Sequence, residues 1–173
     1  MRSRAAAFVV GLVLVVGGLV GSVAVPAAAQ APAGRGRGAF ILQPAPTDKS
    51  VPIPKEQLEK YLKDMEAKGM PTLRMLEGGK YNVNIRRIKS PNAEIHPKTI
   101  DTWVVIEGGG TLVTGGKIVD GKIVGGQSFP MKVGDVHFIP ANLPHGFSTV
   151  NGVVAWLNIR WDVDWPAAAQ QSQ

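Results

Sequence analysis

Three histidines, His96, His137 and His145, are the only imidazoles in this 173-residue chain, which contains no cysteine. Disulfide scaffolds, zinc fingers, iron–sulfur clusters and thiol nucleophiles are therefore excluded. Any metal must bind to His, Asp, Glu or backbone oxygen. In the tripeptide Glu94-Ile95-His96 the two polar residues are two apart, so on an extended strand their side chains share one face. A carboxylate beside an imidazole on an inner face is half of a metal site.

Two further segments carry residues that suit such a site. Asp101 begins a run of apolar residues in which strand alternation puts Asp101 and Trp103 on one face, and that face could also look inward. The second segment covers residues 134–147. Within it Pro140 ends a predicted strand, and an Asn-Leu-Pro corner leads to His145 at the start of the next strand. Such a corner holds one imidazole rigidly.

The elements that position these residues are mostly strands. Between residues 80 and 164, short runs rich in Val, Ile and Thr are broken by Gly, Pro, Asn and Asp, which is typical of an all-β sandwich or barrel. One helix is predicted over 55–68, where apolar residues recur at i, i+3, i+4 and i+7 and Gly69 follows the last turn. Its apolar stripe should lie on a sheet. Residues 117–124 predict a hairpin around Asp120-Gly121, a pair suited to a type I′ turn.

The N-terminal region carries the features of an export signal. Two arginines precede an almost wholly apolar run over 5–25, and Ala27-Ala28-Ala29 gives the small-x-small pattern that precedes a signal-peptidase cut. We predict a signal peptide over 1–29, cleaved after Ala29, and hence a periplasmic or secreted protein. The alternative is an uncleaved membrane anchor, because the apolar run is long enough to span a bilayer.

The rest of the chain divides into three predicted parts. Residues 30–53, rich in Gly, Pro and Arg, are expected to form a flexible linker or arm. Residues 54–165 form the folded domain, and residues 166–173 form a disordered tail. The net charge of +6 is modest and is spread along the chain. Nucleic-acid binding is not expected, because the chain shows no clustered basic face with aromatic residues for base stacking.

The histidine-bearing segments resemble the two motifs of the cupin superfamily, whose members are small antiparallel β-barrels of jelly-roll type. The first cupin motif has the order His-x-His, Glu, Gly, and four residues stand at those positions: Glu94, His96, Asp101 and Gly108. The second motif begins at Gly134, reaches Pro140 after five residues and ends at His145, with Asn142 where the family usually has Gly. The resemblance covers about residues 81–160.

The resemblance implies both the fold and a metal site. The implied fold is an all-β, single-domain cupin-type jelly-roll β-barrel with the helix packed outside. The implied cofactor is a divalent metal ion such as Mn, Fe, Ni or Zn, held by Glu94, His96, Asp101 and His145. Two of these positions depart from the family pattern, Glu for His at 94 and Asp for Glu at 101. If the shorter Asp101 does not reach the ion, a two-His, one-carboxylate triad remains. A metal-free barrel is the alternative.

Residues that could contact a substrate each have a structural alternative. Trp103 and Phe147 share the predicted faces of two ligands, so they line a pocket mouth or belong to the core. Arg86 could bind an anion such as a carboxylate, or it forms a solvated strand edge together with Arg87. His137 is the candidate catalytic residue, as a general base, or else it is a packed wall residue.

Two sets of side chains alternate along the last predicted strand, 153–160: Ala155, Leu157 and Ile159 on one face, and Trp156, Asn158 and Arg160 on the other. The aliphatic set is the better core face. The second set is then expected on an outer sheet, in a dimer contact or at a pocket edge. Because cupins often dimerise through such sheets, the resemblance implies a homodimer.

Three kinds of function fit this sequence. The first is an exported metal-dependent enzyme, an oxygenase or isomerase acting on a small organic acid, sugar or phenolic compound. The second is a sensor or carrier barrel that binds a small molecule without turnover. The third is a structural or storage barrel, because a fold alone does not set function.

Overall fold

The computed structural model describes residues 40–163 of the chain. The predicted signal peptide over 1–29 and the predicted tail over 166–173 lie outside these residues. Within them, no helix is long and apolar enough to cross a membrane. The candidate anchor over 5–25 also falls outside the described part.

The described part is mostly β with one helix, as the sequence predicts. The elements follow in this order: β1 Phe40–Pro44, α1 Lys55–Lys68, β2 Thr72–Glu77, β3 Tyr81–Ile88, β4 Thr99–Thr114, β5 Lys117–Val119, β6 Lys122–Val124, β7 Gln127–Lys132, β8 Val136–Ile139 and β9 His145–Asp162.

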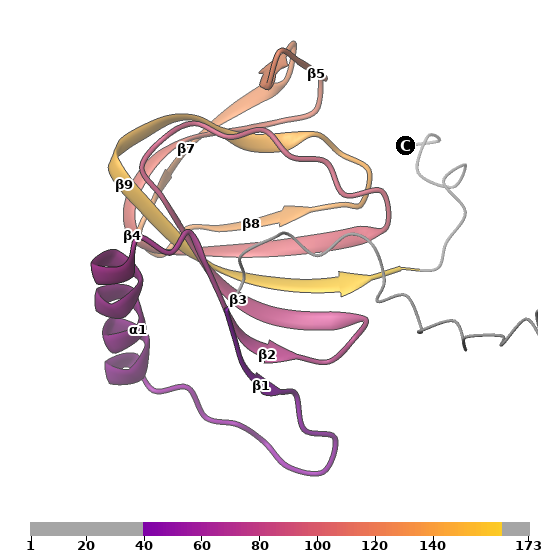
Figure 1. The fold of residues 1–173 in the computed structure, drawn as a ribbon. Helices are drawn as coiled ribbons and strands as arrows, with labels where there is room; N and C mark the ends of the chain where they lie inside the picture. The colour runs from indigo at the N-terminus through magenta and orange to yellow at the C-terminus, as the bar shows by residue number, and fades with distance from the viewer. Residues whose placement is uncertain (1–39, 164–173) are drawn as a thin grey trace, which may run out of the picture. The chain divides into compact units, whose positions relative to one another are not determined.

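Two long strands, β4 and β9, are neighbours in the main sheet (Figure 1). They pair antiparallel along most of their length, with register shifts in the middle. The first half of β4 pairs with β8 and with the end of β9, which continues the order β3-β2-β1. The second half of β4 pairs with β7 and with the start of β9. β4 and β9 therefore lie at the centre of one seven-stranded sheet and connect β7 and β8 on one side with β3-β2-β1 on the other, a pairing typical of a jelly roll.

Gly108 lies at a register shift between β4 and β9. Its φ is +62°, and a Cβ at this position would come within 1.9 Å of the Val153 carbonyl oxygen on β9. Only glycine fits such a close approach of two backbones. The glycine that closes the first motif is thus explained by the close approach of β4 to β9.

The helix α1 has the predicted bounds and covers the outer face of β2 and β3 (Figure 1). Gly69 ends it in the left-handed conformation, with φ +61°. An apolar cluster joins the helix to the sheet: Met65, Leu73, Met75 and Ile85. The apolar stripe therefore lies on a sheet, as its periodicity indicates.

A second apolar cluster lies on the inner face of the seven-stranded sheet: Trp103, Val105, Leu112, Met131, Ile139, Phe147, Val154 and Trp156. The prediction for the last strand is wrong for Trp156, which is 0% exposed, and for Ile159, which is 39% exposed, whereas Ala155 is 0% exposed as expected. Residues paired across neighbouring strands share a face. Trp156 pairs with Val105, so its face of β9 looks inward. Aliphatic residues occur on the opposite face because that face is partly covered by α1.

Strand β1 was not expected from the sequence, whereas the β5–β6 hairpin was. Residues 40–44, placed by the sequence in the linker 30–53, form β1, which pairs in parallel with β2 and has exposed side chains. The β5–β6 hairpin forms a separate two-stranded sheet, as predicted. Its turn residues Asp120 and Gly121 have φ of +48° and +72°, which a type I′ turn requires.

Candidate metal centre

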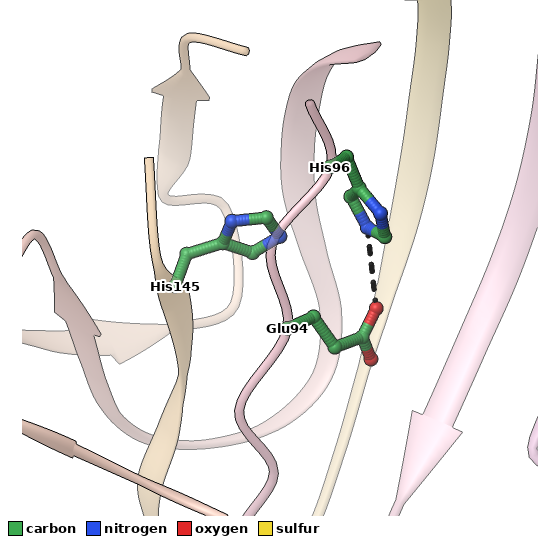
Figure 2. Close-up of side chains that lie close together, drawn as sticks. All are labelled: Glu94, His96 and His145. Atoms are coloured by element: carbon green, nitrogen blue, oxygen red, sulfur yellow. Dashed lines mark ion pairs between the residues drawn. The ribbon is translucent and has the colours of Figure 1, made fainter. Parts of the chain in front are cut away.

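One carboxylate and two imidazoles meet inside the β-domain (Figure 2). The ligand atoms of Glu94, His96 and His145 all lie within 4.8 Å of one another. Glu94 and His96 come from the segment between β3 and β4, and their side chains share one side, with His96 Nε2 3.3 Å from Glu94 Oε2. Two backbone hydrogen bonds of 2.8 and 2.9 Å tie Glu94 to His145 at the start of β9. We refer to these three residues as the Glu/His/His cluster.

His145 is held in the form that binds a metal. Its side chain is 1% exposed, and Nδ1 lies 2.8 Å from the carbonyl oxygen of Leu143, to which it donates. The other nitrogen, Nε2, is buried and has no hydrogen-bond partner among the described residues. Burial lowers the pKa of His145, so the ring is neutral near pH 7. A neutral imidazole with Nδ1–H tied to a carbonyl presents the Nε2 lone pair to an ion.

Glu94 is kept ionised by its neighbours. Burial is the largest single influence and raises its pKa, but the contact with His96 and the charge of Arg86 outweigh it and bring the pKa to about 2. Asn92 also donates from Nδ2 to Glu94 Oε1 at 2.9 Å. The same Asn92 accepts a hydrogen bond from the Phe147 backbone N–H at 3.0 Å. A fixed, charged carboxylate is therefore available as an anionic ligand.

The corner before His145 explains a departure from the cupin motif. Asn142, which stands where the family usually has Gly, has φ +63°. Asparagine enters this left-handed region more easily than most residues. The backbone N–H of Asn142 also donates to the carbonyl oxygen of His96 at 2.7 Å, which links the two motif segments.

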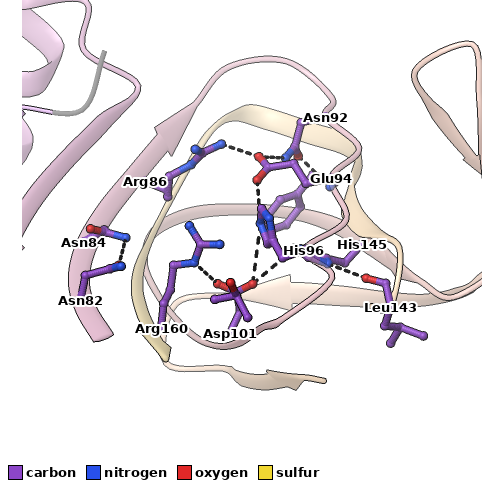
Figure 3. Close-up of polar contacts among 12 residues, drawn as sticks. Asn82, Asn84, Arg86, Asn92, Glu94, His96, Asp101, Leu143, His145 and Arg160 are labelled. Carbon is purple, nitrogen blue, oxygen red and sulfur yellow. Dashed lines mark hydrogen bonds and ion pairs between the residues drawn. The ribbon is translucent and has the colours of Figure 1, made fainter. Parts of the chain in front are cut away.

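Asp101 lies beside the cluster and is fully buried on β4 (Figure 3). Its Oδ2 is 3.8 Å from His96 Nε2 and 3.7 Å from His145 Nε2. Its Oδ1 forms an ion pair with Arg160 Nε on β9 at 2.7 Å. Asp101 is outside the three-residue cluster whose ligand atoms all lie within 4.8 Å. Its role as a fourth metal ligand stays a prediction.

The predicted pocket residues Trp103 and Phe147 belong to the interior core, 1% and 0% exposed. The Trp103 ring meets that of His145 edge-on, with centroids 5.4 Å apart. Trp103 therefore packs against the imidazole ring of His145. Trp103 and Phe147 stack with their centroids 5.8 Å apart. Whether either touches a substrate stays a prediction.

The neighbouring arginines of β3 face opposite sides of the sheet. Arg86 points inward, donates to Glu94 Oε1 and lies 5.9 Å from the centroid of the Trp156 ring (Figure 3). Arg87 points toward α1 and pairs with Glu107 at 2.8 Å and with Glu66 at 3.2 Å. The expectation of a solvated edge is wrong, because β3 lies between β2 and β9 and Arg87 is 8% exposed.

His137 on β8 pairs across the sheet with Trp103 and lies outside the Glu/His/His cluster. Its ring centroid is 4.8 Å from that of Phe129. Burial lowers its pKa, so the ring is neutral near pH 7. These contacts fit the wall residue that the sequence allows. The role of general base stays a prediction.

Sequence reasoning did not assign three contacts at this site: those of the Asn92 amide, of the Leu143 carbonyl and of the Arg160 guanidinium, for which a pocket edge was one of three expected positions. Asn92 stands two residues before Glu94, and that spacing alone was a usable signal for a shared face. The other two depend on the corner before His145 and on the pairing of β9 with β4, which no local pattern specifies.

The path of the strands and the meeting of the two motifs decide the fold. β4 and β9 pair at the centre of the seven-stranded sheet, and they bring the segments 94–108 and 134–145 together around one cluster. The chain has a cupin-type fold.

Solved structures with a similar arrangement share little sequence with this cupin-type chain. The cupin domain of Schizosaccharomyces pombe Cnp3 matches with a TM-score of 0.44 and 10% identity, over 53% of this chain and 60% of that one, which is less than two thirds of its length. A conserved double-stranded β-helix protein from Klebsiella pneumoniae matches with a TM-score of 0.42 and 18% identity, over 53% and 75%. A cupin superfamily protein from Desulfitobacterium hafniense matches with 0.40 and 13%, over 53% and 76%. No family model and no curated protein matches the chain.

Proposed function

We propose that this protein is a metal-dependent cupin enzyme that binds one divalent ion through Glu94, His96 and His145. The observation that carries the proposal is the Glu/His/His cluster, whose ligand atoms lie within 4.8 Å of one another. The unpartnered Nε2 of the buried His145 supports it, because a buried polar atom without a hydrogen bond is costly unless something binds there.

The donor set suits a particular group of metals. Two imidazole nitrogens and one carboxylate oxygen favour Mn, Fe, Ni or Zn over Ca or Mg, which prefer oxygen ligands. An ion held by these two histidines and one carboxylate would supply Lewis-acid chemistry toward a substrate oxygen or, as iron, oxygen chemistry. We therefore assign an oxygenase or isomerase reaction on a small organic acid, sugar or phenolic compound.

The chain's own residues have separate tasks in such a site. The Leu143 carbonyl fixes the tautomer of His145, and Asn92 and Arg86 orient the carboxylate of Glu94. Trp103 and the apolar interior cluster exclude water from the side behind His145. The side chains of His96 and Glu94 are 24% and 26% exposed, so solvent reaches both of them.

Metal content of the purified full chain tests the proposal. We expect about one ion per chain by elemental analysis, and a rise in melting temperature when the ion is added to stripped protein. His96→Ala and His145→Ala should each lower metal affinity at least tenfold, because each removes one of three ligands. The matched control is His137→Ala, which removes the one imidazole outside the cluster and should leave metal content unchanged.

Two results would contradict this proposal. Wild-type protein without bound metal, even after incubation with the four candidate ions, would remove its basis. Equal metal content in all three histidine variants would place the ion elsewhere. Far-UV circular dichroism of each variant separates loss of the ligand from loss of the fold.

A sensor or carrier barrel that binds a small molecule without turnover is the second candidate. The partial exposure of Glu94 and His96 favours it, because binding needs only access and complementary groups. Product formation by the metal-loaded protein separates the two. Export to the periplasm or medium and assembly into a homodimer remain predictions of the sequence.

A further inference from the structure

Arg160 is anchored next to the Glu/His/His cluster through one of its three nitrogens. Its Nε lies 2.7 Å from Oδ1 of Asp101, whose other oxygen is within 3.8 Å of the metal-facing nitrogens of both cluster histidines. One buried carboxylate thus connects the guanidinium to the imidazoles. Asp101 is 0% exposed, so the base of the Arg160 side chain is held by a group that cannot move into solvent.

The other two nitrogens of this guanidinium are unused. Among residues 40–163, nothing forms a hydrogen bond or ion pair with Nη1 or Nη2 of Arg160. Figure 3 shows Arg160 and Arg86 on the same flank of the Glu94–His96 pair. The Arg160 side chain is 18% exposed, so its free nitrogens can be reached from outside. By contrast, the guanidinium of Arg86 is already bound to Glu94.

The charges at the site favour an anion. The side chains of Glu94 and Asp101 contribute two negative charges, and those of Arg86 and Arg160 contribute two positive charges. A divalent ion in the Glu/His/His cluster would leave the site with a net charge of about +2, most simply balanced by an anionic ligand. Free paired N–H groups of a guanidinium match a carboxylate in a two-bond fork.

Further buried polar atoms on the same inner face lack partners. They are Trp103 Nε1, Trp156 Nε1 and Asn158 Oδ1. Asn158 is paired across the sheet with Trp103, and the Trp103 and Trp156 ring centroids are 4.5 Å apart. Two donors and one acceptor therefore lie on the face that carries Arg160. Such a set suits a ligand with more than one oxygen function.

We propose that Arg160 binds the acid group of the substrate, and that the substrate is a small carboxylate carrying a second oxygen close to that group. The second oxygen, a hydroxyl, keto or second carboxylate oxygen, is the one directed to the metal position. Asp101 is the positioning residue that holds Arg160. This inference rests on the proposed function for the reaction, but Arg160 should bind the acid group whether or not the ion is present.

Isothermal titration of four probes tests this inference. Glycolate and malonate are compared with their neutral amides, glycolamide and malonamide, on metal-loaded and on stripped full-length protein. We expect the acids to bind at least tenfold more tightly than the amides. Arg160→Gln should weaken acid binding at least tenfold without changing amide binding. Arg160→Lys keeps the charge beside Asp101 but loses the planar fork. Its affinity for the acids should lie between those of wild type and Arg160→Gln.

The matched control is Lys98→Gln, which removes one positive charge from an exposed position and should change acid affinity less than twofold. The inference is overturned if no acid binds, if acids and amides bind alike, or if both Arg160 variants bind acids as wild type does. If Arg160→Gln does not fold, Arg160→Lys decides the outcome. Metal content of each sample reports separately on the proposed function: wild type that takes up no metal but still binds the acids would contradict only that function.

Discussion

The two faces of the sheet shared by β3 and β9 bury their polar groups in opposite ways. On the face toward α1, the guanidinium of Arg87 is almost fully buried and is paired with both Glu107 and Glu66. On the inner face, Arg160 is paired through Nε alone, and several buried polar atoms have no partner among the described residues. Complete pairing is typical of groups that serve stability, whereas unpaired buried groups indicate a binding site.

A substitution in the apolar cluster on the inner face should have the largest effect on stability. Trp156 is 0% exposed and packs against Trp103 and Phe147. We expect Trp156→Ala to lower the free energy of unfolding by about 3–5 kcal/mol, because it leaves a cavity in the interior cluster. Urea denaturation measures the loss. Tyr81→Ala, at a position 44% exposed, is the control and should cost less than about 1 kcal/mol. Equal losses would show that the interior is not the main core.

The paired arginine should affect stability and nothing else. Arg87→Gln leaves Glu107 without its partner, so we expect a loss of about 2 kcal/mol in the free energy of unfolding. Metal content and acid binding should match wild type, because Arg87 faces away from the cluster. Chemical denaturation measures the free energy of unfolding, and isothermal titration measures metal and acid binding. A weaker metal or acid affinity in this variant would show that the two faces are coupled.

The pKa of Glu94 predicts how acid acts on the metal-free protein. In the folded chain it is about 2, against an ordinary value of 4.5, so the ionised group stabilises the fold fully above pH 4.5. This contribution is lost as the pH falls toward 2, because the unfolded chain binds the proton first. Between pH 4.5 and 3 the loss should be about 1.5 kcal/mol.

Thermal melts of stripped protein from pH 6 to 3 measure this dependence on pH. Glu94→Gln has no carboxyl to titrate, so its stability should fall less steeply over that interval. If wild type and variant show parallel curves, Glu94 is not held ionised by Arg86, Asn92 and His96 as the structure indicates.

The smallest expected effect concerns His137. Because burial lowers its pKa, its imidazole should titrate below 6.5 in a proton NMR titration of the three histidines. His137→Gln identifies its signal and should leave metal content unchanged. A titration midpoint above 6.5 would mean that His137 faces a negative charge rather than the ring of Phe129. His137 would then be the candidate general base instead of a packed wall residue.

Local patterns were sufficient for the elements that depend on nearby residues. The helix over 55–68 and its end at Gly69 follow from apolar spacing and from glycine's tolerance of positive φ. The hairpin follows from Asp120-Gly121. The shared side of Glu94 and His96 follows from alternation. Each of these depends on a few consecutive residues.

The site could be predicted only in part because its remaining contacts join distant strands. Strand β9 has apolar residues on both faces, so alternation alone could not say that Trp156 and Arg160 look inward. That choice depends on α1 covering the other face. The pairing of Arg160 with Asp101 depends on the register of β9 against β4, which is set by the bulges near Gly108. Strand β1 was missed because its side chains are exposed and lack an alternating pattern.

The bridge between Glu94 and His145 has a consequence for the order of events in folding. It joins residues about fifty positions apart, and the intervening chain includes β4, the β5–β6 hairpin, β7 and β8. Contacts of such long range form late, because the entropy of closing the loop must be overcome first. His145 therefore joins Glu94 and His96 only late in folding. We expect the ion to enter a finished barrel rather than to guide its assembly.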